Sequence, residues 1–318
     1  MSHPAQRLLQ VLGIRYPVVQ GGMTFGSDGR LVAAVSEAGG LGTLGTFHYR
    51  TYDRVMPEVE AIRAATDRPF AVNVPFFENN IELVRELTLR GGVKMFTLGG
   101  WFSAEVEELK REHGLTVLVS VNSPTVARMV AERPLDVLIV QGNESGGANN
   151  HFTTRQLFEL ISPTIQAPIL LAGGQWDGLD LHRALLLGAA GIQLGTRFFF
   201  CEESPLHPSI KRWAVDTNGK RPLTTTLSPV SATLNMRFIA NKAFKAAEGS
   251  GEVQQIFSDK ERVFALSEAF FAEQKKPILI YAGTGVHKLE KVERAGEIVE
   301  SIVAGYRAAA AAELPALG

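Results

Sequence analysis

The chain has 318 residues, of which 45% are hydrophobic and 20% charged, and its formal net charge is −1. This composition is too apolar for a disordered chain, and the balanced charge without a basic cluster predicts no nucleic-acid partner. The single cysteine, Cys201, excludes an intramolecular disulfide and a multi-cysteine zinc site. The lack of a secretory signal or of an apolar stretch of about 20 residues predicts a cytoplasmic protein without a membrane span.

The first 200 residues repeat one pattern, in which a short apolar run ends in a polar or glycine-rich turn and an amphipathic helical segment follows. Strands of a parallel sheet are buried on both faces, so such runs indicate parallel strands. The predicted strands lie within eight runs: 17–23, 41–45, 70–76, 93–100, 115–122, 136–143, 168–174 and 191–199. Helices are predicted between them, among others over 52–67, 102–114 and 178–190. Eight strand–helix units favour an α/β fold, a closed (β/α)8 TIM barrel.

The alternation stops after Cys201. The following stretch is mostly helical, with helices predicted over 230–249 and 260–276. An apolar run at 277–286 and a helical segment at 289–310 then resume the earlier pattern. We therefore expect a barrel with a mainly helical inserted second domain, a lid or substrate domain over the barrel mouth. The predicted units are residues 203–276 for the insertion, and residues 1–202 with 277–318 for the barrel.

Amides and glycines follow several of the predicted strands, where a barrel of this kind places its active site. The pairs Gly173–Gly174 and Gly195–Thr196 follow the seventh and eighth runs, the usual position for backbone N–H groups that hold a phosphate. Asn73 and Gln141 end apolar strands, where an unpaired buried amide would cost roughly 1–3 kcal/mol. Both amides therefore need partners, and the pyrimidine edge of a flavin would satisfy them. No close cluster of His, Asp and Glu has metal-ligand spacing, so no metal site is predicted.

Together these segments resemble the nitronate monooxygenase family, also called 2-nitropropane dioxygenases. The resemblance is carried by 19-VQGGM-23, 38-AGGLGTLG-45, 72-VNVPF-76, 141-QGNESGG-147, 171-LAGGQWDG-178, 193-QLGTRFFFCEES-204 and 282-AGTG-285. It implies an FMN-dependent barrel that acts on a small-molecule substrate with dioxygen. The residues that it implies along the flavin ring are Gly22, Met23, Asn73 and Gln141, and those that it implies at the FMN phosphate are Gly173, Gly174, Gly195 and Thr196. Gly146 and Gly147 of the motif after the sixth strand complete the expected cofactor contacts.

The chain departs from this family at the motif after the sixth strand. There the family reads Glu-Ala-Gly-Gly-His, and the histidine serves as catalytic base or binds substrate, whereas this chain has Ala148 in the histidine position. The nearest histidine is His151, and three loop residues can span roughly 10 Å, so His151 is the candidate catalytic residue. The alternative is that His151 caps a helix that starts near Thr153. Glu144 is expected to be structural, and Val119–Ser120 stand where related enzymes often carry a His-Lys pair.

Three functions remain open from the sequence. The first is oxidation of a small alkyl nitronate with dioxygen, the second is reduction of a quinone or enoyl substrate by NAD(P)H through the flavin, and the third is FMN binding without turnover. A preformed nitronate needs an electron acceptor and an anion-tolerant pocket, whereas a neutral nitroalkane also needs a base for its α-proton. The sequence predicts neither the natural substrate nor the oligomeric state.

Overall fold

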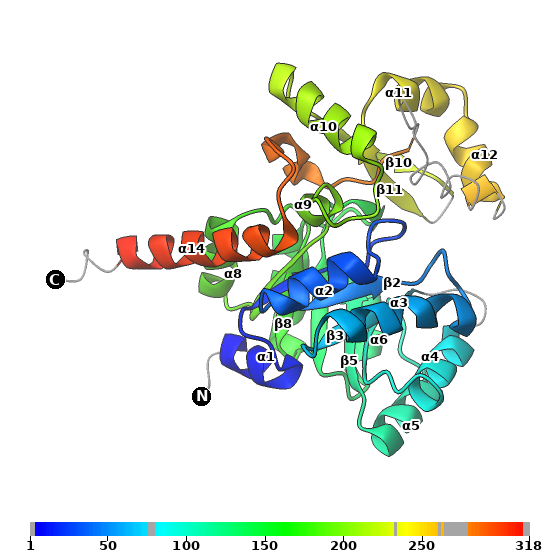
Figure 1. The fold of residues 1–318 in the computed structure, drawn as a ribbon, viewed down its shortest axis with the longest axis vertical. Coiled ribbons are helices and arrows are strands. Elements are labelled where there is room, and N and C mark those ends of the chain that lie inside the picture. Colours follow the sequence, from blue (N-terminus) through cyan, green and yellow to red (C-terminus); the bar gives the residue numbers. More distant parts are fainter. Residues whose placement is uncertain (1–3, 76–79, 232–233, 260–261, 264–278, 314–318) are drawn as a thin grey trace.

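A closed barrel of parallel strands forms the body of the computed structural model (Figure 1), which describes residues 4–75, 80–231, 234–259, 262–263 and 279–313. The eight strands follow the order β1-β9-β8-β6-β5-β4-β3-β2. Each of them lies within one of the predicted runs, which confirms the α/β barrel. Their bounds are β1 Val18–Gln20, β2 Gly42–Gly45, β3 Phe70–Pro75, β4 Met95–Gly99, β5 Thr116–Val121, β6 Val137–Gln141, β8 Ile169–Ala172 and β9 Gly191–Leu194.

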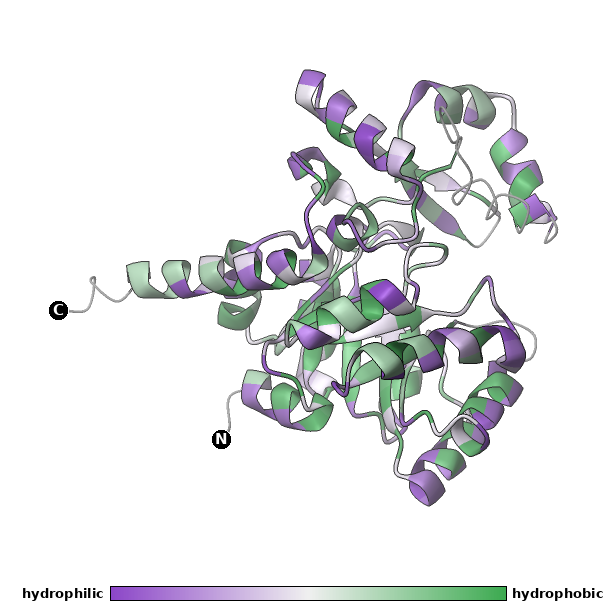
Figure 2. Cartoon of the chain, in the orientation of Figure 1, coloured by the Kyte–Doolittle hydropathy of each residue, from purple (hydrophilic) through white to green (hydrophobic). Residues whose placement is uncertain are grey.

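Helices surround the barrel, with the apolar strands at its centre (Figure 2). Their apolar faces pack on the outside of the sheet, and several of them begin at caps that the sequence encodes. Helix α5 starts after Ser103, whose side chain accepts from the N–H of Val106, and ends at Gly114. The surrounding helices are α1 Pro4–Leu12, α2 Gly29–Glu37, α3 Tyr52–Ala65, α4 Asn80–Leu89, α5 Ala104–His113, α6 Pro124–Ala131, α7 Thr154–Ile161, α8 Gly178–Leu186 and α14 Ala295–Glu313. None of the helices in the described ranges combines the length and the apolar composition needed to cross a membrane.

Helix α1 closes the N-terminal end of the barrel (Figure 1). Its buried residues Leu8 and Leu12 belong to the same apolar cluster as inward-facing strand residues such as Leu41, Leu118 and Leu170. The barrel interior is therefore a packed core at this end. The described residues therefore leave the C-terminal ends of the strands as the side at which a ligand would enter.

The barrel closes between β1 and β2, where the two strands share a single bridge between Val19 and Leu41. The fully buried Gln20 extends this short ladder with its side chain. Its Oε1 accepts from the N–H of Thr43 at 2.9 Å, and its Nε2 donates to the carbonyl of Thr43 at 3.1 Å. The side-chain amide of Gln20 thus makes the two hydrogen bonds that a backbone peptide group would make between β1 and β2.

Replacement of Gln20 by leucine should destabilise the fold, because the buried N–H and carbonyl of Thr43 would lose their partners. Each such group costs roughly 1–3 kcal/mol when it is left unpaired. Urea denaturation should therefore show a clear loss in the free energy of unfolding. The matched control is Gln6→Leu on the exposed side of α1, and equal stability of the two variants would contradict this account of the seam.

The inserted segment lies over the C-terminal end of the barrel (Figure 1). The predicted helix over 230–249 is wrong in its first half, because residues 235–239 form a strand. This strand, β11, pairs with β10 on one side and on the other with β7, which lies in the loop after β6. Partner strands supplied by the tertiary structure override a local helical pattern. The described elements of the inserted segment are α10 Pro208–Lys220, β10 Thr225–Pro229, β11 Asn235–Ile239, α11 Lys242–Gly249 and α12 Glu252–Ser258. Strand β7, in the loop after β6, spans Gly147–Asn149. The helix predicted over 260–276 lies almost wholly outside the described residues.

Candidate active site

A cavity of about 670 Å³ lies at the C-terminal ends of the barrel strands, beneath the inserted segment. Its floor comes from the barrel and carries glycines, amides and hydroxyl groups. Its roof is largely apolar, and we use this name for Leu234, Met236, Phe257, Val263 and Tyr281. The cavity therefore joins a polar floor to an apolar cover.

All ten predicted cofactor contacts line this one cavity, although they come from five different strands and the loops that follow them. The structure brings together Gly22, Met23, Asn73, Gln141, Gly146, Gly147, Gly173, Gly174, Gly195 and Thr196. Convergence of distant loops at the strand ends is typical of a barrel active site.

His151 does not join them. Its side chain is exposed and does not line the cavity, while its backbone N–H donates to Asn150 and its carbonyl accepts from Asn143. The alternative that His151 caps the following helix is wrong, because Thr153 caps α7 in a capping box with Gln156. This position does not support the prediction that His151 is the catalytic base. Ala148, which fills the position of the family histidine, does line the cavity.

The two predicted amides find their partners within the chain. Gln141 donates from Nε2 to the carbonyl of Ala148 at 2.9 Å, and its Oε1 accepts from the hydroxyl of Ser120 at 3.2 Å. Asn73 donates from Nδ2 to the carbonyl of Thr97 at 3.0 Å. The cost of burying these amides is thus met without a ligand, and Gln141 ties β7 to the end of β6.

Gly22 is a glycine because Asn73 occupies the neighbouring space. A Cβ at Gly22 would lie 2.3 Å from the Cβ of Asn73, far inside van der Waals contact. The loop after β1 can therefore approach the end of β3 only with glycine at this position. The contact explains the residue type independently of any ligand.

Glu144 holds the loop after β6 in place, in the structural role expected from the sequence. Its Oε2 accepts from both the N–H and the hydroxyl of Thr154, each at 2.9 Å, at the start of α7. Its backbone carbonyl accepts from the N–H of Thr284 at 2.8 Å. Arg237 of β11 donates to the carbonyl of Asn143 at 2.7 Å. The loop is therefore fixed by α7, by the segment that returns to the barrel, and by the inserted segment.

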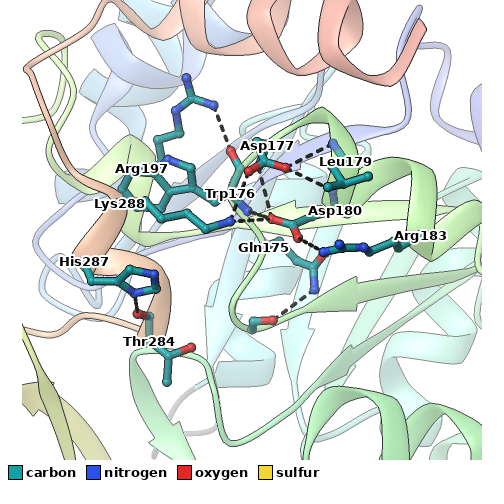
Figure 3. Close-up of polar contacts among 11 residues, drawn as sticks. Gln175, Trp176, Asp177, Leu179, Asp180, Arg183, Arg197, Thr284, His287 and Lys288 are labelled. Atoms are coloured by element: carbon teal, nitrogen blue, oxygen red, sulfur yellow. Dashed lines mark hydrogen bonds and ion pairs between the residues drawn. The ribbon is translucent and has the colours of Figure 1, made fainter. Parts of the chain in front are cut away.

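The turn after β8 has a backbone that favours glycine. Gly173 has a φ of 110° and Gly174 a φ of 72°, values that L side chains rarely adopt. Gln175 donates to the carbonyl of Gly173 at 3.0 Å (Figure 3). Across the same end of the cavity, the hydroxyl of Thr196 accepts from the N–H of Gly283 at 2.8 Å.

Ion pairs fasten this turn to the returning segment, as Figure 3 shows. Lys288, at the end of the short helix η2 (Thr284–Lys288), lies 3.0 Å from the carboxylate of Asp177 and 3.4 Å from that of Asp180. Burial opposes ionisation of Asp177, but the hydrogen bond and charge of Lys288 and two backbone N–H groups leave its pKa below the usual value. The nearly buried Arg197 donates to the carbonyl of Trp176 at 2.8 Å and pairs with Glu293. Both interactions fix the backbone of the turn from outside the cavity.

The cavity also holds side chains that the sequence did not single out, among them Phe47, Arg50, Thr97, Gln175, Gln193 and the roof. Thr97 is only 3% exposed, and its Oγ1 has no hydrogen-bond partner in the part of the chain that the structure describes. Thr97 and Gln193 are polar residues within apolar strands, as Asn73 is. Arg50 has a φ of 61°, and its guanidinium lies 5.5 Å from the centre of the Phe47 ring.

His48 lies next to Phe47 and packs between the rings of Phe25 and Tyr49. Burial lowers its pKa to about 4, below the value of about 6.5 expected in the unfolded chain. The folded state then binds fewer protons than the unfolded state between these two values, so stability should fall as the pH falls from about 6.5 to 4. A shift of this size corresponds to about 3 kcal/mol. Urea midpoints measured across this pH range should fall less steeply in His48→Asn, and an unchanged slope would contradict the prediction.

The comparisons with known proteins agree with this architecture. The model of the nitronate monooxygenase family matches residues 5–85 and 77–305. FabK from Thermotoga maritima has a similar structure, with a TM-score of 0.85 and 26% identity over 98% of this chain and 99% of that one. Nitroalkane oxidase from Streptomyces ansochromogenes gives a TM-score of 0.77 and 26% identity, covering 96% of this chain and 99% of the other.

A sequence relative carries the name of a different reaction. It is the (3aS,4S,5R,7aS)-5-hydroxy-7a-methyl-1-oxo-octahydro-1H-indene-4-carboxyl-CoA dehydrogenase of Mycobacterium tuberculosis, 34% identical over 208 residues. The alignment covers 64% of this chain and 58% of the length of that relative. Relatives of both kinds are oxidoreductases, and the family model extends over most of the described residues. The chain therefore belongs to the nitronate monooxygenase family.

Proposed function

We propose that the chain is an FMN-dependent enzyme that oxidises an alkyl nitronate with dioxygen. The barrel of residues 1–202 and 277–318 would bind FMN, and residues 203–276 would form the lid. The observation that carries the proposal is the character of the cavity wall: amides, hydroxyl groups and glycines, with the guanidinium of Arg50 as a positive charge. Such a wall suits a substrate that arrives as an anion.

The residues present fit FMN. The glycine turn at Gly173 and Gly174 leaves backbone N–H groups near Gly195 and Thr196, which suits the phosphate. The hydroxyl of Thr97, buried without a partner among the described residues, and the remaining N–H of the Asn73 amide suit the polar edge of the ring. When bound, FMN supplies the redox chemistry, and the chain supplies binding, orientation and electrostatics.

The proposed reaction balances without an added reductant. Two nitronates and one dioxygen molecule give two carbonyl products and two nitrite ions. No described residue of the cavity wall is a carboxylate or an imidazole, so the carbon acid must lose its proton before it binds. Arg50 would hold the nitro oxygens of the anion, since a guanidinium pairs well with two oxygens in one plane. Its positive φ is a strained backbone of the kind that gathers at ligand sites.

Anaerobic mixing of the flavin-loaded protein with an alkyl nitronate tests the proposal. We expect the absorbance of oxidised flavin to fall within seconds, and nitrite to appear when dioxygen is admitted. The parent nitroalkane, kept at a pH where it stays neutral, should react far more slowly. An unchanged flavin spectrum with the nitronate would overturn the proposal.

A second candidate is redox chemistry on an acyl thioester. The relative named a CoA dehydrogenase favours it, as does the apolar roof of the cavity. Addition of NAD(P)H to the same anaerobic sample separates the two candidates. Rapid bleaching by NAD(P)H with no response to nitronate would favour the second.

A further inference from the structure

The roof of the cavity is built in advance of any ligand. Met236 lies on β11 and Leu234 immediately precedes the strand, and residues two apart in an extended chain share one face. Phe238, the next residue on that face, is fully buried, and its ring packs on those of Phe257 and Tyr281 at 6.0 and 5.1 Å between centroids. The apolar surface above the floor thus rests on an aromatic core of its own.

Ala148 and Met236 lie directly opposite each other in the antiparallel pair of β7 and β11. Opposed residues of such a pair point to the same side, with Cβ atoms about 4.5–5.5 Å apart. Both residues line the cavity. Alanine at position 148 is small and leaves space beside the flexible side chain of Met236. A larger residue at position 148 would fill that space.

The Ala148–Met236 pair lies next to the polar floor, where the reacting group of the substrate would bind. Gln141, at the end of β6, donates to the carbonyl of Ala148, so the floor and the roof meet at this residue. A substrate held over the polar floor would extend its remaining atoms toward Met236 and Leu234. The chemistry of that surface is aliphatic and aromatic, and it suits a hydrocarbon chain.

We propose that the roof is a subsite for the alkyl chain of the substrate, and that the Ala148–Met236 pair sets the length of chain that fits. The substrate class is then an anion with an extended apolar chain. This inference rests on the proposed function for the identity of the anionic group. Its energetics follow from burial, since each methylene transferred from water to such a surface strengthens binding by up to about fourfold.

Straight-chain carboxylates are the probes that test the subsite. A carboxylate has the planar, two-oxygen anionic group of a nitronate, but it is not oxidised. Titration of the flavin-loaded protein with butanoate, hexanoate, octanoate and decanoate, followed by the flavin difference spectrum and by calorimetry, gives four dissociation constants. We expect affinity to rise about two- to fourfold per methylene until the subsite is filled.

Two variants and one control locate the effect. Ala148→Leu should weaken octanoate at least about fivefold more than it weakens butanoate, because leucine takes up space that the longer chain needs beyond the anionic group. Met236→Ala should lower the gain per methylene, and it keeps the test open if Ala148→Leu loses its flavin. Met129→Ala is the matched control, a methionine on α6 that is 66% exposed and does not line the cavity, and it should leave all four constants unchanged.

The outcomes separate this inference from the proposed function. Chain-length-dependent binding without any nitronate oxidation would contradict the reaction and leave the subsite standing. Nitronate oxidation with carboxylates that bind equally at every length, or that do not bind at all, would overturn the subsite. Equal losses for short and long chains in both variants would also overturn it, since a general loosening of the roof would act on every probe.

Discussion

Ala148→His is expected to give the enzyme activity on neutral nitroalkanes. The side chain at position 148 lines the cavity and lies opposite Met236, so an imidazole there would face the substrate. A positioned general base contributes about 10²–10⁴-fold to proton removal. We therefore expect kcat/KM for a primary nitroalkane to rise by about 10²-fold, with a pH profile that increases through the titration of the new imidazole. Oxidation of the preformed nitronate, which needs no base, should change less than tenfold.

Ala148→Gln is the control for this gain, because glutamine has a similar size and cannot accept the proton at neutral pH. Its nitroalkane activity should stay at the level of the unmodified enzyme. Equal gains in the histidine and glutamine variants would show that size rather than basicity matters. Unchanged nitroalkane activity in Ala148→His, with nitronate oxidation intact, would contradict the argument that the cavity lacks a base.

Gly195→Leu is expected to remove bound flavin from a correctly folded protein. Gly195 has an ordinary φ of −111°, and a Cβ there meets nothing closer than the sulfur of Met23 at 3.7 Å. The backbone can therefore accept a side chain, but that side chain would enter the space assigned to the cofactor. Flavin released by heat from the purified variant should fall by at least about tenfold, in line with a loss of more than 1.4 kcal/mol in binding.

The matched control for this loss is Gly249→Leu at the end of α11, where a Cβ meets nothing within 4 Å. It should retain the flavin content of the unmodified protein. The free energy of unfolding of flavin-free Gly195→Leu, measured in urea, should match that of the flavin-free parent. Full flavin content in Gly195→Leu would contradict the placement of the cofactor beside β9.

The barrel could be predicted from the sequence because its strands are buried on both faces. Segments such as 137–140 and 169–172 are apolar throughout, and few other structures require that pattern between amphipathic helices. Strand β11 gave no such signal, since 235-NMRFI-239 is apolar on one face only and is stabilised by β10 and β7. Its partners lie far away along the chain or across a turn. A pattern confined to one segment cannot reveal them.

The site was predictable where a residue type is forced by the backbone or by burial. The glycines at 173 and 174 and the amides at 73 and 141 fall into this class, and all of them line the cavity. His151 fell outside because distance along a loop does not determine direction, and Asn143 and Asn150 bind its backbone in a turn that leaves the ring exposed. The residues of the roof could not be predicted from the sequence for a related reason. Its residues become neighbours of the floor only when β11 pairs with β7.

Helix α1 closes the N-terminal end of the barrel, and this closure affects the order in which ligands bind and leave. Because that end is packed by Leu8 and Leu12, the molecule bound deepest in the cavity would have to leave past the bound substrate. Under the proposed function that molecule is FMN, which would then load first and leave last. The residence time of the cofactor should lengthen as the concentration of substrate or of a long-chain carboxylate rises. The protein would therefore retain its cofactor best at high substrate concentration.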